Sequence, residues 1–221
     1  EAEPVGLSLP DTFCFAIAGQ AKTGKTNLLQ VLAAQAAGRG DRVLLFDDEA
    51  GSLASFARTA GAERYARDTD GLFDLLREVL VPEFTRRNQC KASGQGLAEE
   101  KNLLVLIHDF AWFNRCVYTS RRDMKGFLEL MLQRGAGHRV SLLACMAVTD
   151  YRDFSAYPFA RSFLSQASGI LLGGQASRQQ ILHLPMAGSK AEARLSAGVG
   201  WLTDGQTVRK VVTPQYQPPG P

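Results

Sequence analysis

Apolar residues along the chain gather in short runs, and between these runs lie longer stretches in which apolar positions recur every three or four residues. A short unbroken apolar run is typical of a strand buried on both faces, whereas the three-to-four spacing is typical of an amphipathic helix. Strands are predicted at residues 12–18, 42–46, 103–107, 140–148, 169–172, 200–203 and 208–212. Helices are predicted from the end of the first glycine loop to 38, from about 52 to 61, from about 71 past 84, and from 123 to 134.

Strands that alternate with helices predict a mostly parallel sheet with crossover helices, which is an α/β fold. Gly38 is expected to end the first helix in the left-handed conformation. Residues 86–101 carry a serine, two glycines and mixed charge, and predict a surface loop or a weak helix. Asp204-Gly205 between the last two strands predicts a hairpin. The whole chain, 1–221, is predicted to form one domain, with a short lead at 1–11 and a tail at 213–221.

A phosphate-binding loop follows the first predicted strand. Residues 19–26 read Gly-Gln-Ala-Lys-Thr-Gly-Lys-Thr, which fits G-x-x-x-x-G-K-[ST] with the required strand before it and helix after it. Lys25 is predicted to reach the terminal phosphates, and the Thr26 hydroxyl to bind Mg²⁺. The predicted nucleotide-binding residues are Gly19, Gln20, Ala21, Lys22, Thr23, Gly24, Lys25, Thr26 and Asn27. The ligand is therefore predicted to be a nucleoside triphosphate, held at the positive end of the helix.

A second nucleotide motif is expected at the end of the strand predicted at 103–107, which runs into His108 and Asp109. In nucleotide hydrolases of this kind one carboxylate holds the Mg²⁺ shell and a second often polarises the attacking water. If Asp109 holds the metal shell, nothing acidic follows it, because Phe-Ala-Trp comes next. If Asp109 is the catalytic residue that polarises water, the metal-shell position is His108, although Mg²⁺ prefers oxygen. A third interpretation is that His108 only caps the strand and Asp109 alone suffices.

The composition limits which partners and which environment can be expected for the chain. The formal net charge is +3 and the basic residues are scattered, which makes DNA an unlikely partner. No segment reaches the roughly 18 uninterrupted apolar residues that a membrane span requires, so the domain itself is expected to be soluble. The chain opens without an initiator Met and is interpreted as a piece of a longer polypeptide. Reduced thiols are expected for all four cysteines, which are Cys14, Cys90, Cys116 and Cys145.

Several other residues remain candidates with two interpretations each. Asp47 and Asp48 end the second predicted strand, where they could line the nucleotide cleft or be solvated turn residues. Trp112, Phe113 and Tyr118 follow the acidic strand and could form a partner surface or belong to the core. The arginines that could serve as a finger toward a neighbour's nucleotide, or be ordinary surface residues, are Arg134, Arg139, Arg161 and Arg178. No His or Cys spacing suits a zinc site.

The stretches at residues 3–7, 13–19, 24–29 and 198–200 resemble FtsK/SpoIIIE-type ATPases, and within them the C-terminal ATPase domain of EssC, called EccC in actinobacteria, of type VII secretion. These matches are spread over almost the entire chain. Asn27-Leu28-Leu29 after the loop and Phe110-Ala111 after the acidic strand are more specific than the loop alone. The resemblance implies a RecA-like P-loop domain that binds ATP and Mg²⁺.

The resemblance also implies two departures from the family pattern. The family's acidic pair falls on His108 and Asp109, so the metal-shell position has become a histidine. In FtsK-like motors the following sensor strand ends Ala-Thr-Gln, whereas here it ends Ala144-Cys145-Met146, so a thioether replaces the polar residue beside the γ-phosphate. We therefore expect ATP binding with weak or no hydrolysis. The alternatives are a fully active FtsK-like motor or DNA translocase, and a P-loop kinase for which no acceptor site or lid is found.

The family suggests partners that these residues do not themselves display. Its members are anchored in the membrane by other parts of the polypeptide, which places this domain at the cytoplasmic face of the cell membrane. They carry several ATPase domains in tandem and recognise small helical-hairpin substrates of the Trp-x-Gly class through a C-terminal signal. The expected partners are therefore exported helical hairpins and sister ATPase domains, and further copies of the chain in a homo-oligomer are a third candidate.

Overall fold

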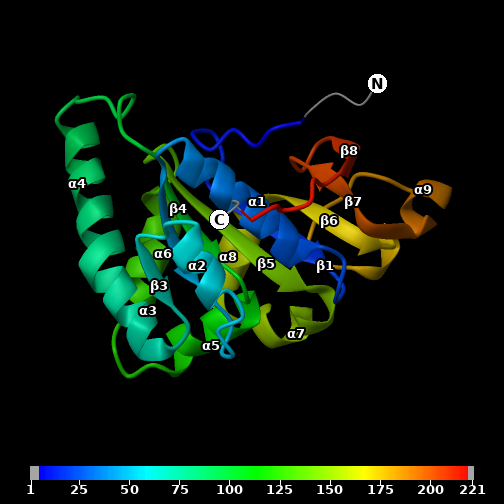
Figure 1. Ribbon diagram of the computed structural model, residues 1–221, viewed down its shortest axis with the longest axis horizontal. Coiled ribbons are helices and arrows are strands. Elements are labelled where there is room, and N and C mark those ends of the chain that lie inside the picture. Colours follow the sequence, from blue (N-terminus) through cyan, green and yellow to red (C-terminus); the bar gives the residue numbers. More distant parts are fainter. Residues whose placement is uncertain (1–4, 219–221) are drawn as a thin grey trace.

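An eight-stranded sheet runs through the middle of the computed structural model, which describes residues 5–218 (Figure 1). The resemblance at 3–7 and the predicted tail at 213–221 therefore lie partly outside the described residues. The strands in spatial order are β3 (Arg64–Ala66), β2 (Arg42–Phe46), β4 (Leu103–Ile107), β5 (Val140–Ala147), β1 (Cys14–Gly19), β6 (Ser168–Gly174), β7 (Leu195–Thr203) and β8 (Val208–Val212). The first six are parallel, and β7 and β8 are antiparallel to their neighbours.

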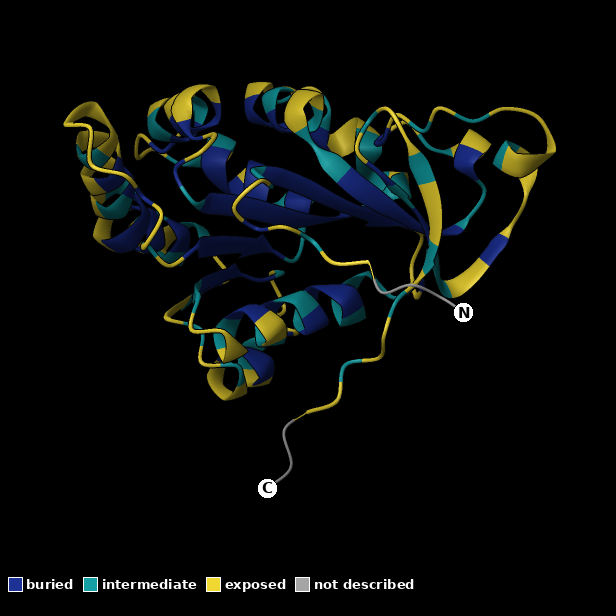
Figure 2. Ribbon diagram, turned by 90° about the horizontal axis from the view of Figure 1, so that it is seen from above, coloured by how far each residue is buried: buried dark blue, intermediate teal, exposed yellow. Residues whose placement is uncertain are grey.

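Helices cover both faces of the sheet, and Figure 2 shows the buried strands between helices whose outer faces are exposed. One face packs against α1 (Lys25–Gly38) and α2 (Ala54–Thr59). The other face packs against α3 (Thr69–Leu75), a π-turn (Leu76–Leu80), α4 (Val81–Ala92), α5 (Phe110–Thr119), α6 (Lys125–Arg134), α7 (Tyr151–Phe154) and α8 (Pro158–Gln166). Successive residues of β4 alternate between the two faces, which explains its unbroken apolar sequence.

The remaining short elements lie between strands. A 3₁₀ turn (Val148–Asp150) follows β5, and a second (Ala176–Arg178) follows β6. The four-residue helix α9 (Ser189–Glu192) precedes β7. The predicted hairpin is confirmed, because Asp204-Gly205 lies in the turn between β7 and β8 and Gly205 has a φ of 91°.

The mostly parallel α/β architecture predicted from the sequence is confirmed. One detail of the prediction was wrong, because Gly38 is the last residue of α1 and does not adopt the left-handed conformation, which falls to Gly40 with a φ of 79°. Of the two interpretations of 86–101, the helical one holds for the first half, which continues α4 as regular helix to Ala92.

Arg87 explains why α4 continues. Its side chain is fully buried, and its guanidinium donates to Glu83 at 2.7 Å. It also donates to the backbone carbonyls of Lys101 (2.8 Å), His138 (3.0 Å) and Arg139 (2.7 Å), which lie just before β4 and β5. This arginine therefore ties α4 to the amino-terminal edge of the sheet rather than presenting charge to a nucleic acid.

Residues 5–218 bear on two expectations drawn from composition, which concern membrane spans and the state of the cysteines. In this part of the chain no helix is both long enough and apolar enough to cross a bilayer. All four cysteines are free thiols, and Cys14, Cys116 and Cys145 are buried.

Candidate functional site

The glycine loop joins the carboxyl end of β1, a central strand, to the first residue of α1. Gly24 precedes the helix with a φ of 106°, a left-handed conformation that side chains disfavour. Gly19 admits no side chain, because a Cβ there would lie 2.5 Å from Thr23 Oγ1 and 2.6 Å from the carbonyl oxygen of Leu172. The two glycines of the motif are therefore required by the shape of the loop.

The loop is closed by its own lysine. Lys25 Nζ donates to the carbonyl oxygens of Gly19 at 3.1 Å and Gln20 at 2.7 Å, and Thr23 Oγ1 donates to the same Gln20 oxygen at 2.9 Å. Burial lowers the pKa of Lys25, against the opposing influence of Cys145 and Asp150. Carbonyl oxygens thus surround the ammonium where the terminal phosphates of a bound nucleotide would be its stronger partners.

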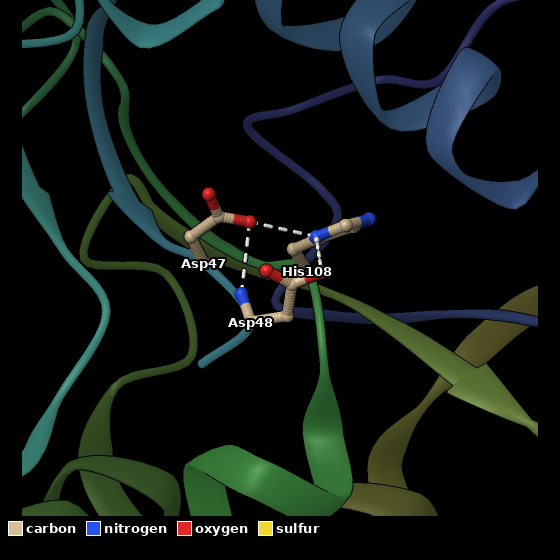
Figure 3. A group of neighbouring side chains, drawn as sticks. All are labelled: Asp47, Asp48 and His108. Carbon is tan, nitrogen blue, oxygen red and sulfur yellow. Dashed lines mark hydrogen bonds and ion pairs between the residues drawn. The ribbon is translucent and has the colours of Figure 1, made fainter. Parts of the chain in front are cut away.

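His108 is the residue that faces the Thr26 hydroxyl. It follows β4 directly, and its Nε2 lies 3.0 Å from Thr26 Oγ1. Its Nδ1 lies 2.7 Å from Asp47 Oδ1, at the end of β2. Figure 3 shows Nδ1 turned toward Asp47 and Asp48 and the other ring nitrogen pointing away from them. Of the two registers considered, the geometry thus brings His108, rather than Asp109, to the predicted Mg²⁺ ligand.

Asp47 fixes the orientation of the imidazole. The carboxylate is fully buried and accepts hydrogen bonds from the backbone N–H groups of Asp48 (2.8 Å) and Leu53 (2.7 Å) and from the Tyr65 hydroxyl (2.9 Å). Burial acts to raise the pKa of Asp47, but these hydrogen bonds and the one to His108 outweigh it and lower the pKa. Burial and the bond to Asp47 in turn raise the pKa of Tyr65 to about 12. The carboxylate is therefore ionised and fully used as an acceptor.

Asp109, the predicted catalytic residue, has a structural contact of its own. It is the N-cap of α5, and its Oδ1 accepts a hydrogen bond from the backbone N–H of Trp112 at 2.9 Å. Among the described residues, no hydrogen bond joins it to the glycine loop. On β5, Met146 is buried beside Ala18, and Cys145 Sγ donates to the Lys25 carbonyl oxygen at 3.7 Å. Apolar or weakly polar groups thus form the floor of the site.

Asp47, Asp48 and His108 could in principle hold a cation, since one ligand atom from each lies within 4.8 Å of the others. Both oxygens of Asp48, however, accept hydrogen bonds from Ser52, at 2.9 Å from its N–H and 2.5 Å from its hydroxyl. Mg²⁺ demands nearly octahedral oxygen ligands and usually retains several waters. An imidazole next to Thr26 and two carboxylates whose oxygens all already accept hydrogen bonds fit that ion poorly.

The candidate arginines are not gathered around the loop. Arg134 ends α6 and Arg139 precedes β5, at the amino edge of the sheet, opposite the glycine loop. Arg161 on α8 donates to the Ala156 carbonyl at 2.9 Å. Arg178 follows β6 at the carboxyl edge, where it lines an open cavity of about 430 Å³ together with Arg152. Arg152 was not among the predicted arginines.

The aromatic residues after β4 divide between core and surface. Phe113 is buried with Phe110, whereas Trp112 and Tyr118 are half-buried. Trp112 Nε1 donates to the Arg67 carbonyl at 2.8 Å, and the hollow beside it is lined mainly by charged and polar side chains. Phe113 therefore belongs to the core, and the hollow beside Trp112 is polar.

Comparison with protein-family models found no match, and neither did comparison with curated proteins. Solved structures do resemble the chain. EssC (ATPases 2 and 3) from Geobacillus thermodenitrificans superposes with a TM-score of 0.76 at 17% identity over 96% of this chain. Thermomonospora curvata EccC (ATPases 2 and 3), solved in complex with a signal sequence peptide, gives 0.73 at 19% identity over 97%. The pCW3 conjugation coupling protein TcpA, solved with ATPγS, gives 0.65 at 16% identity over 90%.

The chain spans 39% of each of the two secretion structures and 60% of TcpA. At these identities the likeness establishes the fold, which is that of RecA-like P-loop ATPases. It agrees with the resemblance recognised in the sequence motifs.

Proposed function

We propose that the chain is the C-terminal nucleotide-binding domain of a type VII secretion ATPase, which binds ATP and hydrolyses it weakly or not at all. The observation that carries this proposal is the chain of contacts from Asp47 through His108 to Thr26. It places an oriented imidazole, in place of a carboxylate, at the hydroxyl that would bind Mg²⁺. The glycine loop, in contrast, keeps every element needed to bind phosphate.

The residues of the glycine loop and of the strand ends beside it have different roles in this proposal. Backbone N–H groups of the loop and the Lys25 ammonium bind the phosphates, and the helix dipole of α1 adds to their positive potential. His108, held by Asp47, donates or accepts a hydrogen bond at the Thr26 hydroxyl. A bound Mg²⁺ would neutralise phosphate charge, and Thr26 is the residue predicted to hold it. One carboxylate oxygen of Asp109 is occupied by the helix cap of α5.

The partners are proposed from the structural neighbours and the sequence resemblance together. One neighbour was solved with a signal sequence peptide, and the secretion neighbours contain more than one ATPase domain. We infer that this domain contacts sister domains of its own polypeptide, receives exported helical hairpins, and acts at the cytoplasmic face of the membrane to which the rest of the protein is anchored. The alternative is a competent motor or DNA translocase, which the histidine at position 108 disfavours.

Titration of the domain with ATP and with a slowly hydrolysed analogue tests the proposal. ATP should raise the melting temperature of the wild type, because a ligand that binds only the folded state stabilises it. Lys25→Ala should abolish this shift, because the phosphates would lose their ammonium partner. The fold should be retained, since among residues 5–218 the Lys25 ammonium donates only to loop carbonyls. Lys101→Ala is the matched control, because Lys101 lies just before β4 at the opposite edge of the sheet and should leave the shift unchanged. No shift in the wild type at millimolar ATP would refute nucleotide binding.

A further inference from the structure

The outer side of the glycine loop is covered by the last strands of the chain. In β7, Gly198 donates its N–H to the Thr23 carbonyl at 3.0 Å. The Gly198 carbonyl accepts from the N–H of Thr213 at 2.8 Å and from its hydroxyl at 3.1 Å. Gly198 has a φ of 76°, and its N–H would lie 3.6 Å from a Cβ at Gly24, so the backbones of strand and loop approach closely here. The loop is therefore linked, through one residue of β7, to the segment that follows β8.

That segment continues across the first turn of α1. Asn27 donates from Nδ2 to the Pro214 carbonyl at 2.8 Å and accepts at Oδ1 from the N–H of Tyr216 at 2.8 Å. The Tyr216 ring packs edge-on against Phe56 of α2, with centroids 5.3 Å apart. In Figure 1 the C-terminal stretch runs in front of α1. We call residues 213–216 the C-terminal strap. The Gly198 carbonyl holds its first residue, and the Asn27 amide and the Phe56 ring hold its other end.

The two sides of the loop offer different chemistry. Toward β4 and β5 lie the Lys25 ammonium and the Thr26 hydroxyl, which are groups for the terminal phosphates, together with His108. On the other side lie Gly198 and the strap. A triphosphate whose terminal phosphates occupy the first side can extend its nucleoside over the second.

We propose that the C-terminal strap is the nucleoside-binding wall of this nucleotide site, an inference that rests on the proposed nucleotide binding. Pro214 and Gln215 are exposed on the strap, and they offer a base an apolar ring and a side-chain amide. The Asn27 amide does not contact the base in this arrangement, because both of its ends hold the strap backbone. Asn27 and Tyr216 are thus positioning residues for the base, and the loop alone binds the phosphates.

The test compares ATP with inorganic tripolyphosphate, which carries the same phosphates and no nucleoside. Tyr216→Ala removes the ring that anchors the strap on α2 without changing the glycine loop. We expect this variant to lose about tenfold or more in ATP affinity and to bind tripolyphosphate as the wild type does. Tyr157→Ala is the control, since Tyr157 stacks on Tyr118 on the opposite face of the sheet and should change neither affinity.

Other results of these titrations would overturn either the nucleoside wall or the proposed function. ATP affinity that is unchanged or increased in Tyr216→Ala would overturn the nucleoside wall, and an increase would identify the strap as an obstruction. Equal losses for ATP and tripolyphosphate would overturn it as well, because they would show a general effect on the loop. Failure of the wild type to bind either ligand would instead refute the proposed function. Asn27→Ala, which releases the strap at its other anchor, should repeat the selective loss of ATP affinity.

Discussion

Replacing His108 by aspartate tests the central contact of the site. In the wild type the imidazole bridges Asp47 Oδ1 and Thr26 Oγ1. His108→Asp would place a third carboxylate beside Asp47 and Asp48, and it would create the hard oxygen ligand that Mg²⁺ prefers. His108→Asn is the matched control, because it also loses the imidazole but adds no charge.

The expected destabilisation by His108→Asp follows from the contacts that are lost and gained. Loss of a hydrogen bond to an ionised carboxylate costs about 1.5–3 kcal/mol. Two like charges about 4 Å apart repel by up to about 4 kcal/mol at an effective dielectric constant of 20, and protonation or ion binding relieves part of this. A net destabilisation of about 3 kcal/mol for His108→Asp corresponds to a fall in melting temperature of roughly 6–12 °C for a domain of this size. The melting temperature of His108→Asn should fall by about half as much.

Thermal unfolding in EDTA and in Mg²⁺, with and without ATP, provides the assay, together with phosphate release. We expect Mg²⁺ to restore stability and to enhance ATP binding or turnover in His108→Asp, but to have little effect on the wild type or on His108→Asn. A tenfold or greater fall of wild-type ATP affinity in EDTA, or an aspartate variant that gains no response to Mg²⁺, would refute a metal-poor site with His108 in place of the ligand. A wild-type turnover of about 1 s⁻¹ or more would separately refute weak hydrolysis.

Two further predictions concern stability and partners. Burial acts to raise the pKa of Glu83, but hydrogen bonds from Arg86, Arg87 and Arg42 lower it to about 2. Because the folded pKa lies below the ordinary 4.5, ionised Glu83 should contribute about 2 kcal/mol to the free energy of unfolding above pH 4.5. This stabilisation should be lost as the pH falls toward 2. Glu83→Gln should therefore flatten that part of a curve of stability against pH. In paired titrations at near-physiological salt, a helical-hairpin substrate encoded beside the parent gene should bind, and random duplex DNA should bind weakly with a steep salt dependence. Tight duplex binding with no response to the hairpin would favour the DNA-translocase alternative.

Much of the fold could be predicted from the sequence because its signals are local. The strand predicted at 103–107 has the same bounds as β4, since an unbroken apolar run of five residues fits a strand buried on both faces. The three-residue strand β3 and the helix α8 were not predicted. Three residues are too few to show a period, and α8 lies among turns that conceal its spacing. The continuation of α4 depends on carbonyls about 14 and 51 residues away from Arg87, which no local pattern can reveal.

The site shows the same division between local and distant information. The glycine loop is contiguous, so its residues and its position between strand and helix could be predicted. The contact between Asp47 and His108 joins residues that are 61 positions apart, and the sequence left both aspartates as cleft or turn residues. For Asp109 a local signal was present but was not used. An aspartate directly before an amphipathic apolar stretch is typical of a helix N-cap, which is what it forms.

The thiol of Cys145 gives the floor of the nucleotide site an unusual chemical inertness. It lies under the loop on β5 and donates to the Lys25 carbonyl, and burial raises its pKa to about 12. Oxidants and alkylating reagents attack the thiolate, which is scarce at such a pKa. Although a cysteine lies directly beneath the lysine of the glycine loop, its burial makes it a poor target for reagents that attack thiolates. Cys90, a half-buried thiol on α4, is the more accessible point for chemical labels that leave the nucleotide site untouched.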